Sequence, residues 1–152
     1  MKEAEIVNQR VLAGKEKALG PGHVSTLNTV NNLGILYSNQ GKLKEAEIMY
    51  QRALAGREKA LGPDHTSTLN TLNNLGNLYS KQGQLKEAEI MYQRALAGKE
   101  KALGPDHAST LTTVNNLGNL YSGKLEEAEM MYQRALAGGE KALGPDYHGL
   151  AG

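Results

Sequence analysis

The stretch NTLNNLGNLYS, residues 70–80, has the spacing of a helix although it is rich in residues that weaken helices. Its apolar and small positions form one helical stripe: Leu72, Leu75, Gly76, Leu78 and Tyr79. Asparagine and glycine cost a helix roughly 0.7 and 1 kcal/mol each relative to alanine. The stripe therefore predicts a helix, and its four asparagines call for a separate explanation.

The same stretch occurs three times, so the chain is built of internal repeats. The copies read LNTVNNLGILYS from Leu27, LNTLNNLGNLYS from Leu69 and LTTVNNLGNLYS from Leu111. A second motif, EAE, starts at positions 3, 45, 87 and 127, which are 42, 42 and 40 residues apart. Residues 3–44 and 45–86 are identical at 32 of 42 positions. Self-similarity at this period is typical of solenoids, in which each unit buries its apolar face against its neighbours.

One repeat predicts two antiparallel helices. The turn GPDH at 62–65 precedes the first, helix A, which runs to about Gln82, where Gly83 ends it. The candidates for its N-cap are Asp64, His65 and Ser67, and the sequence does not choose among them. Helix B follows from about Leu85 to Leu103, and the short link makes the two helices antiparallel neighbours. The stripe predicted to be buried on helix B is Ala88, Met91, Tyr92, Ala95, Leu96 and Leu103.

We expect an all-α fold, a right-handed superhelical solenoid of antiparallel helix pairs with about seven helices. Residues 1–152 form a single repeat array in this interpretation. Its parts are a lone helix B at 2–19, repeat 1 at 23–61, repeat 2 at 65–103, repeat 3 at 107–143 and a tail at 144–152.

The pattern of Leu75-Gly76, Tyr79, Ala88, Tyr92 and Ala95 resembles the tetratricopeptide repeat. The usual period of that repeat is about 34 residues. Here the extra length lies in GKEKALGPDH, and this longer form is similar to the arrays of kinesin light chains and of fungal NOD-like receptors. The resemblance implies a module that binds peptides or proteins on the concave face, largely through helix A, with asparagines that hold the peptide backbone.

The asparagines lie on the face of helix A that the apolar stripe leaves uncovered. An amide side chain both donates and accepts hydrogen bonds, so it suits the backbone of an extended peptide. Asn32, Asn74 and Asn116 hold matching positions and are the predicted backbone clamps; the alternative is a structural ladder between neighbouring A helices, and both can hold together. The candidate peptide-binding residues are Asn28, Asn31, Asn32, Asn70, Asn73, Asn74, Asn77, Lys81, Asn115, Asn116 and Asn119.

The composition argues against other classes of function. The net charge is +1, with 17 basic and 16 acidic residues interleaved, which gives no reason to expect nucleic acid or an anionic membrane. There is no cysteine and no apolar run of the roughly 18 residues that a membrane helix needs, so a cytoplasmic protein without cofactor or metal is expected. The histidines of GPxH recur at the repeat period, too far apart to share a metal, and are expected to make hydrogen bonds near the helix caps. Paired glutamates such as Glu45 and Glu47 suit the first turn of a helix, so we expect no enzyme.

Three features leave alternatives open. Gly14, Gly56, Gly98 and Gly138 interrupt helix B, either for close contact with the next unit or for flexibility. The ends of the array stay repeat-like, through Val7, Val11 and Leu12 at one end and Ala135 and Leu136 at the other, so end-to-end stacking of molecules is expected. A purely structural, self-assembling array is the alternative to peptide binding.

Repeat 3 lacks two residues in its inner turn, reading YSGKLEEAE where repeat 2 reads YSKQGQLKEAE. Leu117, Tyr121, Leu125, Ala128, Tyr132 and Ala135 then follow one another at helical spacing. Two outcomes are open: Gly123 ends a shortened helix A and the hairpin survives, or helices A and B fuse and exchange with a second chain as a homodimer. We favour the hairpin.

Overall fold

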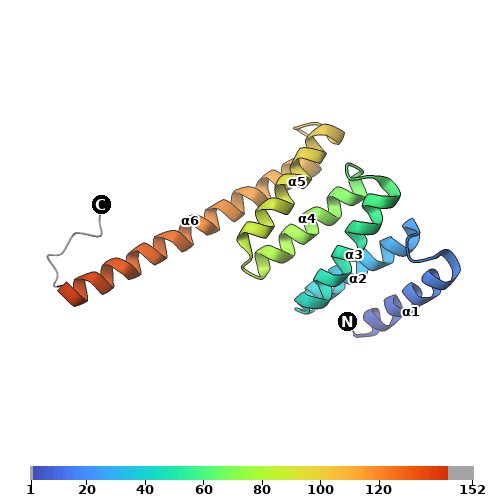
Figure 1. Cartoon of the computed structure of the whole chain (residues 1–152), viewed down its shortest axis with the longest axis horizontal. Coiled ribbons are helices and arrows are strands. Elements are labelled where there is room, and N and C mark those ends of the chain that lie inside the picture. Colours follow the sequence, from blue (N-terminus) through green and yellow to red (C-terminus); the bar gives the residue numbers. More distant parts are fainter. Residues whose placement is uncertain (1, 144–152) are drawn as a thin grey trace. The chain divides into compact units, whose positions relative to one another are not determined.

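The computed structural model describes residues 2–143, and within the last helix it describes no side chain at positions 127, 131 and 139–143. Six helices account for this part of the chain (Figure 1): α1 (Lys2–Leu19), α2 (Val24–Asn39), α3 (Leu43–Leu61), α4 (Thr66–Lys81), α5 (Leu85–Leu103) and α6 (Ala108–Leu143). The predicted all-α solenoid of helix pairs is confirmed. The predicted tail at 144–152 lies outside the described residues.

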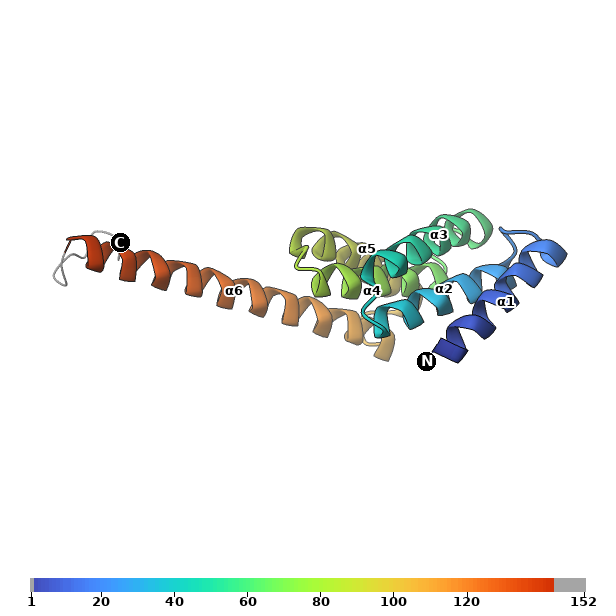
Figure 2. The ribbon, with the colours of Figure 1, turned by 90° about the horizontal axis from the view of Figure 1, so that it is seen from below.

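The chain divides into two compact units, residues 1–117 and 118–152. In the first unit, α1 packs on α2, α2 on α3, α3 on α4 and α4 on α5, and α2 also touches α4 (Figure 2). Helices α2 and α4 correspond to helix A, and α1, α3 and α5 to helix B. Most residues of the predicted stripes form the core: in repeat 2, Leu69, Leu72, Leu75, Leu78, Tyr79, Ala88, Tyr92 and Ala95 are buried. Met91, Leu96 and Leu103, which were also predicted to be buried, are only partly covered.

The turn that joins helix A to helix B depends on a glycine in the left-handed conformation. Gly41 has φ +78° and Gly83 has φ +77°. In the first of these turns the backbone N–H of Lys42 donates to the carbonyl oxygen of Tyr37 at 2.8 Å, five residues back. This bond and the glycine form the motif with which many helices end.

Repeat 3 cannot build this turn, and α6 runs unbroken through it. Its glycine, Gly123, is two residues after Tyr121, whereas Gly41 is four residues after Tyr37. Gly123 is not among the described glycines with positive φ, and α6 continues as one helix of 36 residues. The favoured hairpin is therefore wrong, because the deletion removes the residues that close the turn. Residues 2–143 thus hold six helices, close to the expected number of about seven.

The turns from helix B to the next helix A are closed by residues that the sequence interpretation left open or missed. His65 is the N-cap of α4, and its Nδ1 accepts from the backbone N–H of Ser67 at 3.1 Å, which decides among the three candidates. His23 and His107 do the same in the neighbouring repeats. The buried Thr68 hydroxyl donates to the carbonyl oxygen of Gly62 at 2.8 Å. The expected local role of the histidines is confirmed, and the role of the threonine was missed.

The glycines within helix B make close contact inside their own repeat, not with the next unit. A Cβ on Gly56 would lie 2.5 Å from Cδ2 of Leu27, and Gly98 meets Leu69 in the same way. Gly14 and Gly138, by contrast, have nothing within 4 Å. Close packing is thus the role of two of these glycines, while the other two lie on helix surfaces without that cover.

Candidate functional site

The helix-A face of the first unit is hollowed between α2 and α4. This hollow, which we call the α2–α4 groove, has a volume of about 210 Å³ and is lined by Ile35, Ser38, Asn39, Tyr50, Asn74, Asn77 and Lys81. Six of these residues lie on the two A helices, on the face that the sequence singled out. The seventh, Tyr50, comes from α3.

Tyr50 reaches this face because α2 has a glycine in its path. A Cβ on Gly34 would lie 2.7 Å from the Tyr50 ring, so the ring lies flush against the backbone of α2. The pair recurs as Gly76 and Tyr92, whose hydroxyl donates to Oδ1 of Asn77. Burial raises the pKa of both Tyr50 and Tyr92 to about 12, so each phenol remains a neutral donor. Helix B therefore supplies a donor to the helix-A face, a contribution that the sequence did not reveal.

The asparagines divide into two columns. In the first column, the side chains bond to the next helix A. Oδ1 of Asn31 accepts from Thr71 Oγ1 at 3.4 Å, and Oδ1 of Asn73 accepts from Thr113 Oγ1 and from Asn116 Nδ2, both at 3.2 Å. These amides form the structural ladder that was the alternative interpretation.

The second column is more open. Asn32 is exposed and Asn74 half-buried, and neither side chain makes a hydrogen bond with another described residue. Asn116, the third predicted clamp, differs because its amide donates to Asn73. Asn32 and Asn74 thus keep donors and acceptors for a ligand, and Asn74 lines the α2–α4 groove.

The remaining predicted site residues are placed as follows. Asn28 is exposed and accepts from Arg57 Nη2 at 2.9 Å. Lys81 is exposed and donates to Ser38 Oγ at 3.1 Å across the groove. Asn70, Asn115 and Asn119 are exposed. The structure therefore brings Asn74, Asn77 and Lys81 into one groove and leaves the other candidates along the rest of the face.

Arg57 is a residue that the sequence interpretation missed, because it lies on helix B. It is 6% exposed, and its guanidinium bonds Ser67 O at 3.0 Å and Thr71 Oγ1 at 2.7 Å as well as Asn28. Lys15 and Lys99 hold the matching positions and bond the matching threonines, Thr29 and Thr113. These cations are engaged under the helix-A face, so they supply no free positive charge to a ligand.

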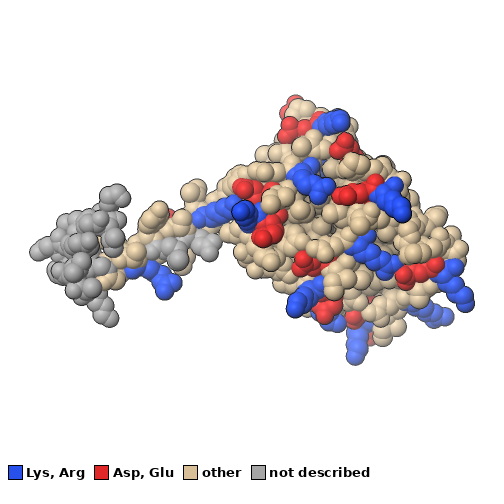
Figure 3. All heavy atoms as spheres, viewed as in Figure 1, with Lys and Arg blue, Asp and Glu red and all other residues tan. Residues whose placement is uncertain are grey.

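The surface carries no large field of one sign in the view of Figure 3, where basic and acidic side chains alternate. Among the described residues no group of histidine and acidic side chains could hold a metal. Within the same part of the chain no helix is long and apolar enough to cross a bilayer. The face thus offers amides, hydroxyls and one lysine rather than a charged or metal-binding centre.

Comparison with known proteins identifies the architecture. The family model described as tetratricopeptide repeat matches residues 1–59, 31–101 and 67–141, which together cover most of the chain. The chain belongs to the tetratricopeptide repeat family. Proteins built of these repeats are generally interaction or scaffold modules, and that is the general class of this tetratricopeptide array.

The solved structures that are similar to it include two longer chains. The crystal structure of BtubC (BKLC) from P. vanneervenii has a TM-score of 0.75 and 26% identity, covering 97% of this chain and 59% of that one. A Podosopora anserina protein with nearly identical TPR-like repeats, described as a candidate kinesin light chain, has a TM-score of 0.74 and 28% identity, covering 93% and 68%. This tetratricopeptide array thus spans little more than half the length of BtubC. No curated protein sequence matches it.

Proposed function

We propose that this array is a scaffold or sensor module that binds an extended peptide in the α2–α4 groove, with Asn74 and Asn32 bonding the peptide backbone. The observation that carries this proposal is the groove itself, which has an unengaged amide at Asn74 and the Tyr50 ring in its lining. The amide can bond a backbone N–H and C=O whatever the peptide sequence, while the exposed Ile35 offers apolar contact to one side chain.

The chemistry of the groove limits the class of peptide. Lys81 is its one lysine or arginine, and it already donates to Ser38. A terminal carboxylate or an acidic motif needs clustered cations, usually arginines, for tight binding. The proposed ligand is therefore an uncharged internal peptide segment with one apolar side chain. We also propose that the protein is a non-catalytic binder and that it acts in the cytoplasm.

The proposal is tested by selecting peptides from a random displayed library on the whole chain and measuring their affinity by fluorescence anisotropy. Asn74→Ala should weaken binding about five- to tenfold, the equivalent of one lost hydrogen bond. Asn8→Ala is the matched control, since Asn8 lies on α1 and donates to Ala4 O of its own helix. Equal affinities for the native chain and Asn74→Ala, across all selected peptides, would contradict the proposal.

The alternative of a purely structural array is supported by the bonded column of Asn31 and Asn73. It predicts that no peptide is selected above background. The two functions are therefore separated by the outcome of the selection itself.

A further inference from the structure

In the two intact repeats, helices A and B meet through two glycine contacts. The Tyr50 ring lies on Gly34 and the Tyr92 ring on Gly76, and these tyrosines are only 4% and 3% exposed. The reverse contact joins a leucine of helix A to a glycine of helix B: Leu27 to Gly56, and Leu69 to Gly98.

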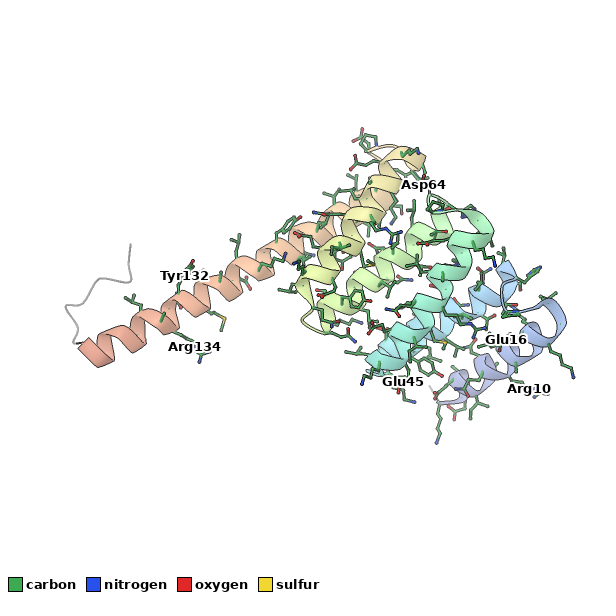
Figure 4. All side chains as sticks on the ribbon, in the orientation of Figure 1. Arg10, Glu16, Glu45, Asp64, Tyr132 and Arg134 are labelled. Atoms are coloured by element: carbon green, nitrogen blue, oxygen red, sulfur yellow. The ribbon has the colours of Figure 1, made fainter. Side chains whose placement is uncertain are left out.

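Repeat 3 carries all four matching residues, but none has its partner. Tyr132 is 76% exposed and Leu111 is 49% exposed, while Gly118 and Gly138 have nothing within 4 Å of where a Cβ would be. Figure 4 shows the side chain of Tyr132 standing out from the α6 ribbon. Repeat 3 therefore has the helix-A surface and the helix-B surface of an A–B contact, and both surfaces are uncovered.

The two surfaces cannot meet within one chain while α6 is continuous. Gly118 and Tyr132 are 14 residues apart in α6, which is about 21 Å along a helix at about 1.5 Å per residue. A second molecule has no such limit.

We propose that α6 pairs antiparallel with α6 of a second copy, so that helix B of each chain packs on helix A of the other. The register follows from the intact repeats. Gly118 and Tyr132 lie seven residues on either side of Leu125, and Leu111 and Gly138 lie 14 and 13 residues from it. A two-fold axis near Leu125 thus makes both contacts at once, and each occurs twice, as in any isologous dimer. Leu125 is 72% exposed and would be buried on this axis.

A polar contact of repeat 2 is available to the same pairing. The Tyr92 hydroxyl donates to Asn77 in that repeat. Asn119 matches Asn77 and is exposed, and Tyr132 matches Tyr92. The exchanged pair would join the Tyr132 hydroxyl to Asn119 of the other copy.

End-to-end stacking would instead place helix α1 of a second copy on the helix-A part of α6. Helix α1 fits this surface less well than helix B of repeat 3 does. At the position of Tyr50 it has Asn8, which cannot fill the space above Gly118. At the position of Ala53 and Ala95, both 0% exposed, it has the larger Val11. The sequence of helix B that matches this surface is the one within α6.

The proposal is tested by light scattering coupled to gel filtration, at protein concentrations from micromolar to millimolar. The native protein should reach a plateau at twice its mass of 16.4 kDa. A variant with Lys-Gln inserted before Gly123 regains the spacing of repeat 2 and should be a monomer. A native monomer throughout, a dimeric insertion variant, or a mass that grows without a plateau, as stacking predicts, would each overturn the exchanged dimer.

Two glycine substitutions separate the proposed register from general effects on folding. Gly118→Ala and Gly123→Ala gain the same helix propensity, and both sites are open in the single chain. In the exchanged pair only Gly118→Ala puts a methyl group under Tyr132. Gly118→Ala should therefore weaken dimerisation at least tenfold and Gly123→Ala should not. Equal dissociation constants for the two variants would contradict the register.

Discussion

Gly56 of α3 lies so close to Leu27 of α2 that a Cβ on the glycine would stand 2.5 Å from Cδ2 and 2.8 Å from Cδ1 of the leucine. Leu27 is 1% exposed and therefore has little room to move. A residue that costs a helix about 1 kcal/mol thus stands where a buried side chain of the other helix packs against the backbone.

Gly56→Ala should lower the free energy of unfolding by about 1–3 kcal/mol, because overpacking outweighs the gain in helix propensity. Gly14→Ala is the matched control at the same position of α1, where nothing lies within 4 Å, and it should be neutral or stabilising. Urea unfolding followed by circular dichroism measures both. Two variants of equal stability would mean that the Gly56 contact does not matter.

Asn73→Ala and Asn74→Ala should affect stability differently although they are neighbours on α4. Asn73 accepts from Thr113 and Asn116, and each lost hydrogen bond costs about 1 kcal/mol, whereas Asn74 bonds no described residue. Both variants gain the same helix propensity, so their difference in melting temperature reports the ladder alone. Asn74→Ala should stay within a few degrees of the native chain; a loss above roughly 2 kcal/mol would make Asn74 structural.

The sequence predicted the helices of repeats 1 and 2 and their buried stripes because three near-identical copies repeat one apolar pattern. It predicted a candidate site on the helix-A face for the same reason. The sequence could not show which asparagines bond to the next helix A and which do not, because Asn73 and Asn74 differ only in which neighbour they face. Gly76 and Tyr92 were predicted as members of the buried stripes, but the delivery of the Tyr92 phenol to the helix-A face depends on the close approach of the two helices.

Stability should fall in alkali between pH 10 and about 12. Burial raises the pKa of Tyr50 and Tyr92 from 10 to about 12, so the folded chain holds two phenolic protons that the unfolded chain has lost. Their stabilising effect is complete below pH 10 and then falls by up to about 1.4 kcal/mol per pH unit for each tyrosine. Burial lowers the pKa of Lys99 from 10.5. Its contribution to stability therefore rises with pH, but only up to pH 10.5.

The tyrosine contribution is isolated by the double variant Tyr50→Phe/Tyr92→Phe. It should flatten the dependence of the unfolding free energy on pH between 10 and 12, measured by urea unfolding at each pH. An unchanged slope in the variant would show that other groups control the alkaline transition.

Leu125→Cys should form a disulfide-linked dimer on mild oxidation, because the proposed two-fold axis brings this position opposite itself. The chain has no cysteine of its own, so the new thiol is the single reporter. Val7→Cys, on the exposed surface of α1, controls for random oxidation and should remain largely monomeric. Non-reducing electrophoresis gives the yields, and equal crosslinking of the two variants would argue against the axis.

The continuity of α6 shows where sequence interpretation fails for a physical reason. The apolar spacing from Leu117 to Ala135 fits one helix, and Gly123 favours a break, so local preferences conflict. The outcome depends on whether a hydrogen-bonded turn can close. With two residues removed, the bond from Lys42 to Tyr37 in repeat 1 has no equivalent, and the helix continues.

The most direct test of the central claim, that asparagine amides bind the backbone of a peptide, is an ester scan of a library-selected peptide. Each ester replaces one backbone N–H with oxygen and leaves the side chains unchanged. Anisotropy titrations of the native chain and Asn74→Ala then form a double-mutant cycle. We expect one ester to weaken binding to the native chain about five- to tenfold and to have little effect on Asn74→Ala. If, for every ester, the loss of affinity caused by the ester and the loss caused by Asn74→Ala simply add, the account is contradicted.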